Sequence, residues 1–61
     1  MKDFERVLKA LANRRRLSIV KYLKKEKEAS VSEIAGKIGI SLKATSKHLG
    51  ILSAADIVDK E

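Results

Sequence analysis

The chain has 61 residues, no cysteine, no proline and a net charge of +6 at pH 7. A chain this short forms one domain at most and buries only about 60% of the surface that its unfolded form exposes. We therefore expect a single domain over residues 1–61, without room for a separate catalytic cleft and without disulfides or thiolate metal sites.

No apolar stretch approaches the roughly 20 residues of a membrane span, and acids interrupt the N-terminal MKDFERVLKA where a signal peptide would be apolar. We expect a cytoplasmic protein that does not contact a membrane. Ala, Leu, Lys, Glu and Arg dominate, and aromatic residues make up only 3% of the chain. This composition favours helix over strand, so the predicted fold class is all-α.

The first predicted helix follows Asp3, which could cap its free amide groups. Its apolar residues have the i, i+3, i+4, i+7 spacing of one helix face: Phe4, Val7, Leu8 and Leu11. Asn13 then predicts a break and the cap of a second helix. The apolar residues of that helix cover more than half of its circumference: Leu17, Ile19, Val20, Tyr22 and Leu23. We expect the second helix to be central.

The third and fourth predicted helices carry clear start and stop signals. Ser30 and Glu33 have the spacing of a capping box, in which each side chain meets a backbone amide of the other. Gly39 permits the left-handed conformation that ends a helix, and Ser41 caps a fourth helix over about 41–53. Helix, glycine turn and capped helix form a helix-turn-helix, whose second helix can lie in the major groove of DNA.

A helical wheel divides the fourth helix into two faces. One face is expected to pack: Leu42, Ala44, Thr45, His48, Leu49, Ile51, Leu52 and Ala55. It includes the single histidine, His48, which we expect to pack or to form a hydrogen bond within the domain. The other face is narrow, short-chained and cationic: Lys43, Ser46, Lys47, Gly50, Ser53 and Ala54. Serine and lysine can both bind phosphates and base edges.

Charge is zoned along the chain. Residues 6–25 and 34–55 contain basic residues and no acid. Such zoning is expected for a polyanion partner such as nucleic acid, although surface lysines are often only solvated. RNA would satisfy the same electrostatics. Arg16 falls among apolar positions, so its stem is predicted to pack while its head pairs with an acid or a phosphate.

Four segments, in this order and spacing, resemble the ArsR-type winged helix-turn-helix repressors of bacteria and archaea: KALANRRRLSIVKYL, SVSEIAGKIGIS, ATSKHLGIL and LSAADIV. The resemblance covers nearly the whole chain. It implies a small trihelical helix-turn-helix core of a winged-helix domain, with four helices and at most a vestigial wing strand. It also implies sequence-specific binding of double-stranded DNA by a transcriptional regulator, with repression as the expected outcome.

The departures from that family pattern are informative. Ser30, Val31 and Ser32 stand where family metal sensors often carry Cys-Val-Cys, so we expect neither a metal nor a cofactor. Ile57 and Val58 correspond to the start of the wing, which three further residues cannot complete. The chain resembles the DNA-binding core of a longer repressor, as a fragment or a natural miniature, with the first helix left as a possible homodimer surface.

The candidate DNA-binding residues come from three predicted helices. Lys43, Ser46 and Lys47 are the expected groove contacts. Ser30, Ser32 and Ser41 are expected to act as caps, and their helix N-termini could also bind phosphate. The full set is Arg14, Arg15, Ser32, Lys37, Ser41, Lys43, Ser46 and Lys47. The chain has no Ser-His-acid or paired-carboxylate constellation, so we expect no enzymatic activity. The alternative is a protein-interaction or dimerisation module that keeps the scaffold and uses exposed apolar residues: Phe4, Val7, Leu8, Ile57 and Val58.

Overall fold

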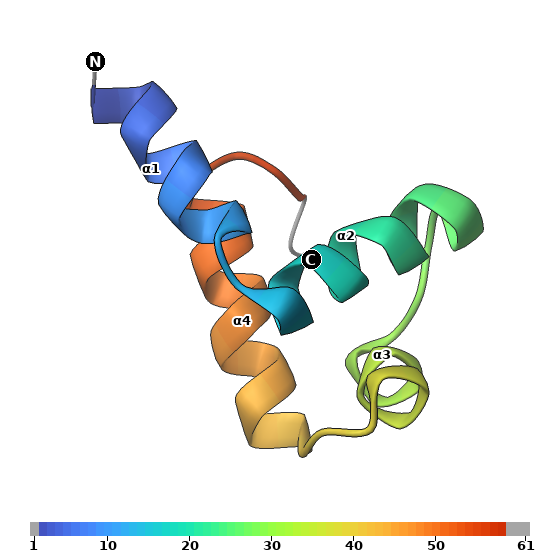
Figure 1. Cartoon of the computed structure of the whole chain (residues 1–61). Helices are drawn as coiled ribbons and strands as arrows, with labels where there is room; N and C mark the ends of the chain where they lie inside the picture. Colours follow the sequence, from blue (N-terminus) through green and yellow to red (C-terminus); the bar gives the residue numbers. More distant parts are fainter. Residues whose placement is uncertain (1, 59–61) are drawn as a thin grey trace.

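Four helices make up the computed structural model, which describes residues 2–58 (Figure 1). They are α1 (Lys2–Leu11), α2 (Arg14–Glu26), α3 (Val31–Ile38) and α4 (Leu42–Ala54). Residues 2–58 contain no strand. The all-α prediction is therefore confirmed, and the absence of a strand in this part of the chain agrees with the prediction of at most a vestigial wing strand.

The starts of α2 and α3 agree with the predicted caps. The Asn13 side chain accepts hydrogen bonds from the backbone amides of Arg15 at 2.9 Å and Arg16 at 3.1 Å. The capping box of α3 is complete: the Ser30 hydroxyl accepts from the Glu33 amide, and the Ser30 amide donates to the Glu33 carboxylate, each at 3.1 Å. These contacts satisfy amide groups that the first turn of a helix leaves without partners.

The turn between α3 and α4 also has the predicted chemistry. Gly39 has a φ of +82°, a left-handed conformation that L side chains rarely adopt, and its amide donates to Ala35 O at 2.8 Å. The Ser41 hydroxyl accepts from the Ala44 amide at 3.1 Å and so starts α4. In Figure 1, α3 is viewed along its axis and α4 from the side, so the two helices cross steeply. They are separate rods, as a helix-turn-helix requires.

The first helix begins earlier than predicted. Asp3 lies inside α1, which starts at Lys2, and so it is not the cap. Its carboxylate still lies in the first turn, where negative charge interacts favourably with the helix dipole. The prediction of Asp3 as a cap was wrong because a favourable acid in the first turn and a capping acid give the same sequence signal.

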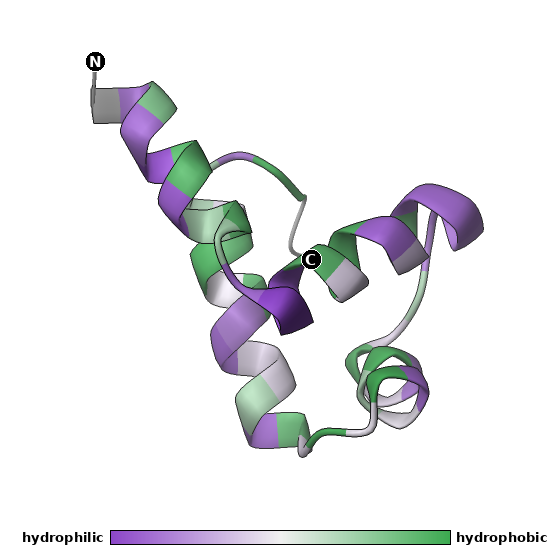
Figure 2. Cartoon of the chain, viewed as in Figure 1, coloured by the Kyte–Doolittle hydropathy of each residue, from purple (hydrophilic) through white to green (hydrophobic). Residues whose placement is uncertain are grey.

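The core lies where all four helices meet, and α2 and α4 each pack on the other three helices. One residue of α2 and two of α4, Ile19, Thr45 and Leu52, have no exposed surface. The buried residues are Ala10, Ile19, Ile34, Ala35, Thr45, Leu49, Leu52 and Ala55. Figure 2 shows α2 hydrophilic at both ends and apolar in its middle, where it crosses the core. The predicted central role of the second helix is confirmed.

Several apolar side chains that were assigned to packing faces remain exposed. Phe4 is 57% exposed, Leu8 53%, Leu17 50% and Leu42 54%. Helical periodicity identifies an apolar face but does not say whether another element covers it. In α1, contact with the core passes through the buried Ala10 and its neighbours, so the Phe4 and Leu8 positions of the predicted face have no cover within residues 2–58.

The chain turns sharply after α4. Asp56 has a φ of +57°, and its amide donates to Ser53 O at 3.0 Å, while the Ile57 amide donates to Leu52 O at 2.9 Å. This pattern is a Schellman motif with aspartate at the position that glycine usually occupies, at a cost of about 1 kcal/mol. Ile57 and Val58 then pack, half-buried, against the core. They are therefore not free to contact a partner, and the alternative prediction was wrong in assigning Ile57 and Val58 to an interaction surface.

Candidate nucleic-acid interface

The first two turns of α4 present a cationic surface to solvent. Ser41, Lys43, Ser46 and Lys47 are all exposed, and no acid occurs between residues 34 and 55. Both lysines point away from the core, which is the arrangement that a DNA-reading helix needs. This exposed N-terminal part of α4, defined by these four residues, is called the α4 surface below.

The second half of α4 is less accessible. Gly50 and Ser53 are half-buried, although the wheel placed them on the same face as the lysines. The Arg6 guanidinium from α1 donates to Ala54 O at 3.5 Å, so α1 lies against this end of the helix. The part of α4 that can approach a large ligand is therefore its beginning.

A buried hydroxyl anchors the start of α4. Thr45 is fully buried, and its Oγ1 donates to Ser41 O at 2.8 Å, beside the backbone bond from its own amide at 2.9 Å. The wheel placed Thr45 on the packing face but did not identify this bond. The spacing of four residues between Thr45 and the carbonyl of the cap residue is the signal that could have found it. The bond holds the first turn of the α4 surface.

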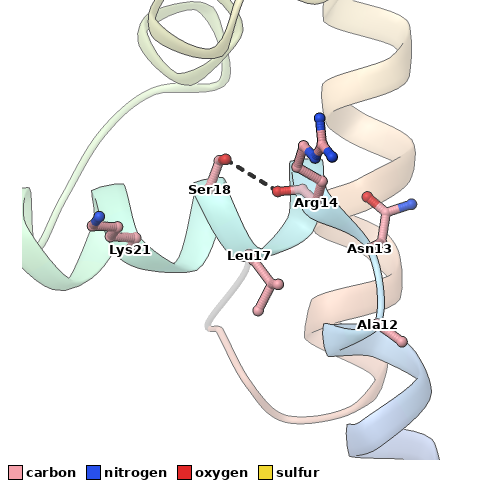
Figure 3. Close-up of a pocket in the computed structure, with 6 residues that line it drawn as sticks. All are labelled: Ala12, Asn13, Arg14, Leu17, Ser18 and Lys21. Atoms are coloured by element: carbon pink, nitrogen blue, oxygen red, sulfur yellow. Dashed lines mark hydrogen bonds between the residues drawn. The ribbon is translucent and has the colours of Figure 1, made fainter.

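A second basic group lies at the start of α2. Arg14 and Arg15 are exposed immediately after the Asn13 cap. A shallow groove of about 450 Å³ runs along this end of the helix (Figure 3). It is lined by Ala12, Asn13, Arg14, Leu17, Ser18 and Lys21. The Ser18 hydroxyl donates to Arg14 O at 3.0 Å. Because two cations and no acid line the groove, its electrostatics favour an anion.

Arg16 points in a different direction from its two neighbours. Its Nε donates to Ala10 O at 2.6 Å, and its Nη2 lies 3.5 Å from Lys9 O, at the C-terminal end of α1. Its Nη1 lies 3.2 Å from Nδ1 of His48 on α4. No acid partners this guanidinium among the described residues, since two carbonyls and an imidazole take its hydrogen bonds. A phosphate partner for it stays a prediction. One side chain thus joins α1, α2 and α4.

The half-buried His48 ring is held mainly in its neutral form. Burial lowers its pKa from the ordinary value of 6.5, and the positive charges of Arg16, Arg15 and Lys47 lower it further. The prediction that His48 packs or forms a hydrogen bond within the domain is confirmed by the Arg16 contact. Because Arg15 and Lys47 both act on the same ring, the two basic groups lie near each other.

The lowered pKa of His48 predicts a pH-dependent stability. The unfolded chain takes up a proton at His48 near its ordinary pKa of 6.5, whereas the folded protein does so only at lower pH. The neutral ring therefore contributes its full stabilisation of the fold above pH 6.5. This stabilisation is lost progressively as the pH falls from 6.5 toward the pKa of the folded state. Urea unfolding between about pH 7.5 and 5.5 should show the free energy of unfolding decreasing. A His48→Gln variant should lack most of this decrease; the same decrease in both proteins would contradict the assignment.

The remaining candidate residues lie on α3. Ser32 and Lys37 are both exposed, Ser32 within the first turn and Lys37 in the last. The cap of α3 is Ser30, so the expectation that Ser32 also acts as a cap was wrong. No side-chain hydrogen bond or ion pair joins Ser32 or Lys37 to the α4 surface within the described residues, and their part in binding remains a prediction.

Other kinds of site have no basis in the described residues. No group of three or more His, Asp or Glu side chains in residues 2–58 could hold a metal ion. None of the four helices has the length and apolar character needed to cross a membrane.

Comparison with known proteins identifies one family. The model of a family described as a helix-turn-helix domain matches residues 11–61, which include α2, the α3–α4 unit and the segment after it. No curated protein and no solved structure gives a significant match to the chain.

Proposed function

Because the chain belongs to the ArsR-type helix-turn-helix domain family, we propose that it binds double-stranded DNA in a sequence-specific manner and represses transcription. In this proposal α4 enters the major groove, with Lys43, Ser46 and Lys47 facing the bases and the phosphates. Arg14 and Arg15 contact flanking phosphates, and the protein acts in the cytoplasm of its cell.

The observation that carries the proposal is the α4 surface. It is the start of a capped helix, held in place by the buried Thr45, with two exposed lysines and no acid nearby. Helix-turn-helix proteins use the N-terminal residues of their second helix for base contacts, and this is the half of α4 that α1 leaves free. The accessible half of α4 is therefore also the half that carries the two lysines.

Binding of duplex DNA at several salt concentrations tests the proposal. The Lys43→Ala and Lys47→Ala variants should each bind more weakly, and each should reduce the slope of log affinity against log salt by about 0.9, because each removed phosphate contact releases fewer counterions. Fluorescence anisotropy between about 50 and 200 mM salt measures these slopes. Lys24→Ala is the matched control: it removes an exposed lysine from the last turn of α2, and Figure 1 shows that this end of α2 is the one farther from α4. Slopes that do not differ between the α4 variants and this control would remove both lysines from the interface.

A second candidate function is self-association or partner binding through α1. Phe4 and Leu8 are four residues apart on one helix face and more than half exposed. Sedimentation of the same samples with and without DNA distinguishes the two functions. Association that salt does not weaken and that needs no DNA favours the α1 surface, whereas salt-sensitive binding of duplex DNA over single-stranded RNA favours the proposal above.

A further inference from the structure

The imidazole of His48 has one nitrogen that the protein uses and one that it leaves available. Nδ1 lies 3.2 Å from Nη1 of Arg16, and Nε2 has no hydrogen-bond partner within residues 2–58. Every fully buried side-chain nitrogen and oxygen in the described residues has a partner. Nε2 is therefore accessible to solvent, although the ring as a whole is half-buried.

The contact with Arg16 determines which nitrogen carries the proton. A guanidinium can only donate hydrogen bonds and does not lose its proton in proteins, so Nδ1 must accept with its lone pair. In the neutral ring the hydrogen is then on Nε2, and the accessible nitrogen is a donor. The lowered pKa of His48 keeps the ring in this neutral form near pH 7.

The surroundings of this donor are positively charged. The charges that act on His48 come from Arg16 and Arg15 on α2 and from Lys47 on α4, the residue before it. From α1, the carbonyls of Lys9 and Ala10 hold Arg16, and the ammonium of Lys9 lies 3.4 Å from the carboxylate of Glu5. No acid is among the groups whose charges shift the pKa of His48. An accessible N–H between cations is suited to an anionic acceptor.

On the premise of the proposed DNA binding, we propose that His48 donates its Nε2–H to a phosphate oxygen of the DNA backbone, between the phosphate contacts of Arg15 and Lys47. Arg16 acts as a positioning residue, because its guanidinium fixes both the orientation and the tautomer of the ring. The contact differs in kind from those of the lysines. A neutral donor forms a directional hydrogen bond to a charged acceptor without bringing a charge of its own to the phosphate.

Two substitutions separate the roles of the two nitrogens. His48→Asn keeps an acceptor near the Nδ1 position, so Arg16 retains its partner, but it places no donor where Nε2 lies. His48→Gln places an amide nitrogen near the Nε2 position and leaves no acceptor close to the backbone. Histidine and asparagine have similar helix propensities, so the first change should not by itself destabilise α4.

The probe is a mixed-sequence duplex of two helical turns, roughly 20 base pairs. His48→Asn should keep a melting temperature close to that of the unmodified protein and bind this duplex about ten-fold more weakly, as loss of one hydrogen bond to a charged acceptor implies. Its salt slope should be unchanged, unlike that of Lys47→Ala. His48→Gln should retain more of the DNA affinity and lose more of the thermal stability.

A second measurement does not depend on the variants folding. Two-bond proton–nitrogen correlation of the ring should show Nδ1 unprotonated and Nε2 protonated in the free protein, with the Nε2 resonance moving when the duplex is added. Unchanged affinity in His48→Asn, or a ring whose resonances DNA leaves unmoved, would overturn this inference while salt-dependent binding by the unmodified protein still supported the proposed function. No binding by the unmodified protein would instead refute the proposed function itself.

Discussion

Replacing Leu52 with alanine is expected to unfold much of the protein at room temperature. Leu52 has no exposed surface and lies in the core that all four helices share. A buried leucine-to-alanine change costs about 2–5 kcal/mol, because it removes apolar contacts and leaves a cavity. A domain of this size has only about 3–5 kcal/mol of net stability. Far-UV circular dichroism during urea unfolding should show a midpoint close to zero denaturant.

The adjacent Ile51 is the matched control for this experiment. It is on the same helix, has a similar apolar side chain and is 36% exposed. Its replacement by alanine should cost clearly less, about 1–2 kcal/mol, since about a third of the residue is already in water and its loss leaves no closed cavity. Equal losses for the two variants would mean that α4 does not present the Leu52 face to the core, and the lysine face would then not be free either.

The helix starts and the central turn were predictable because their chemistry is local. Asn13, Ser30 and Ser41 each bond to amides two or three residues further along the chain, and Gly39 adopts the left-handed conformation that its missing side chain permits. The residues that make these contacts are neighbours in sequence. The order of four helices, and with it the helix-turn-helix, follows from such local signals.

The covered faces were less predictable because burial depends on distant elements. Leu17 and Leu42 have the spacing of packing residues, yet each is about half exposed. Apolar periodicity reports only what a helix can bury. On α4, the lysine face was correctly separated from the core, but Gly50 and Ser53 are partly covered where α1 lies against that end.

The link between Arg16 and His48 was beyond the sequence for the same reason. The two residues are 32 positions apart, and neither belongs to a local motif that names the other. The sequence placed both among apolar positions and left their polar atoms without partners. The packing of α2 against both α1 and α4 resolves this, because it gives the guanidinium two carbonyls of α1 and an imidazole of α4.

This link makes Arg16 the polar residue whose loss should most affect the fold. Arg16→Met keeps an apolar stem of similar length but removes every donor. Ala10, whose carbonyl accepts the 2.6 Å bond, is only 2% exposed, so that oxygen would lose its partner in a place with little access to water. A buried acceptor left unpaired, together with the lost His48 contact, should cost about 2–3 kcal/mol.

Arg15→Met is the control, because it removes the same charge from the neighbouring position, where the side chain is exposed. Its unfolding midpoint should change little, while its DNA affinity should fall through loss of a phosphate contact. Arg16→Met should instead lower the unfolding midpoint strongly and also release the ring of His48. Chemical denaturation of both variants measures the difference, and two equal midpoints would mean that the bridge from α1 to α4 contributes nothing to stability. Because charge is matched between the two variants, the comparison separates the three hydrogen bonds of Arg16, to α1 and to α4, from the effect of its charge.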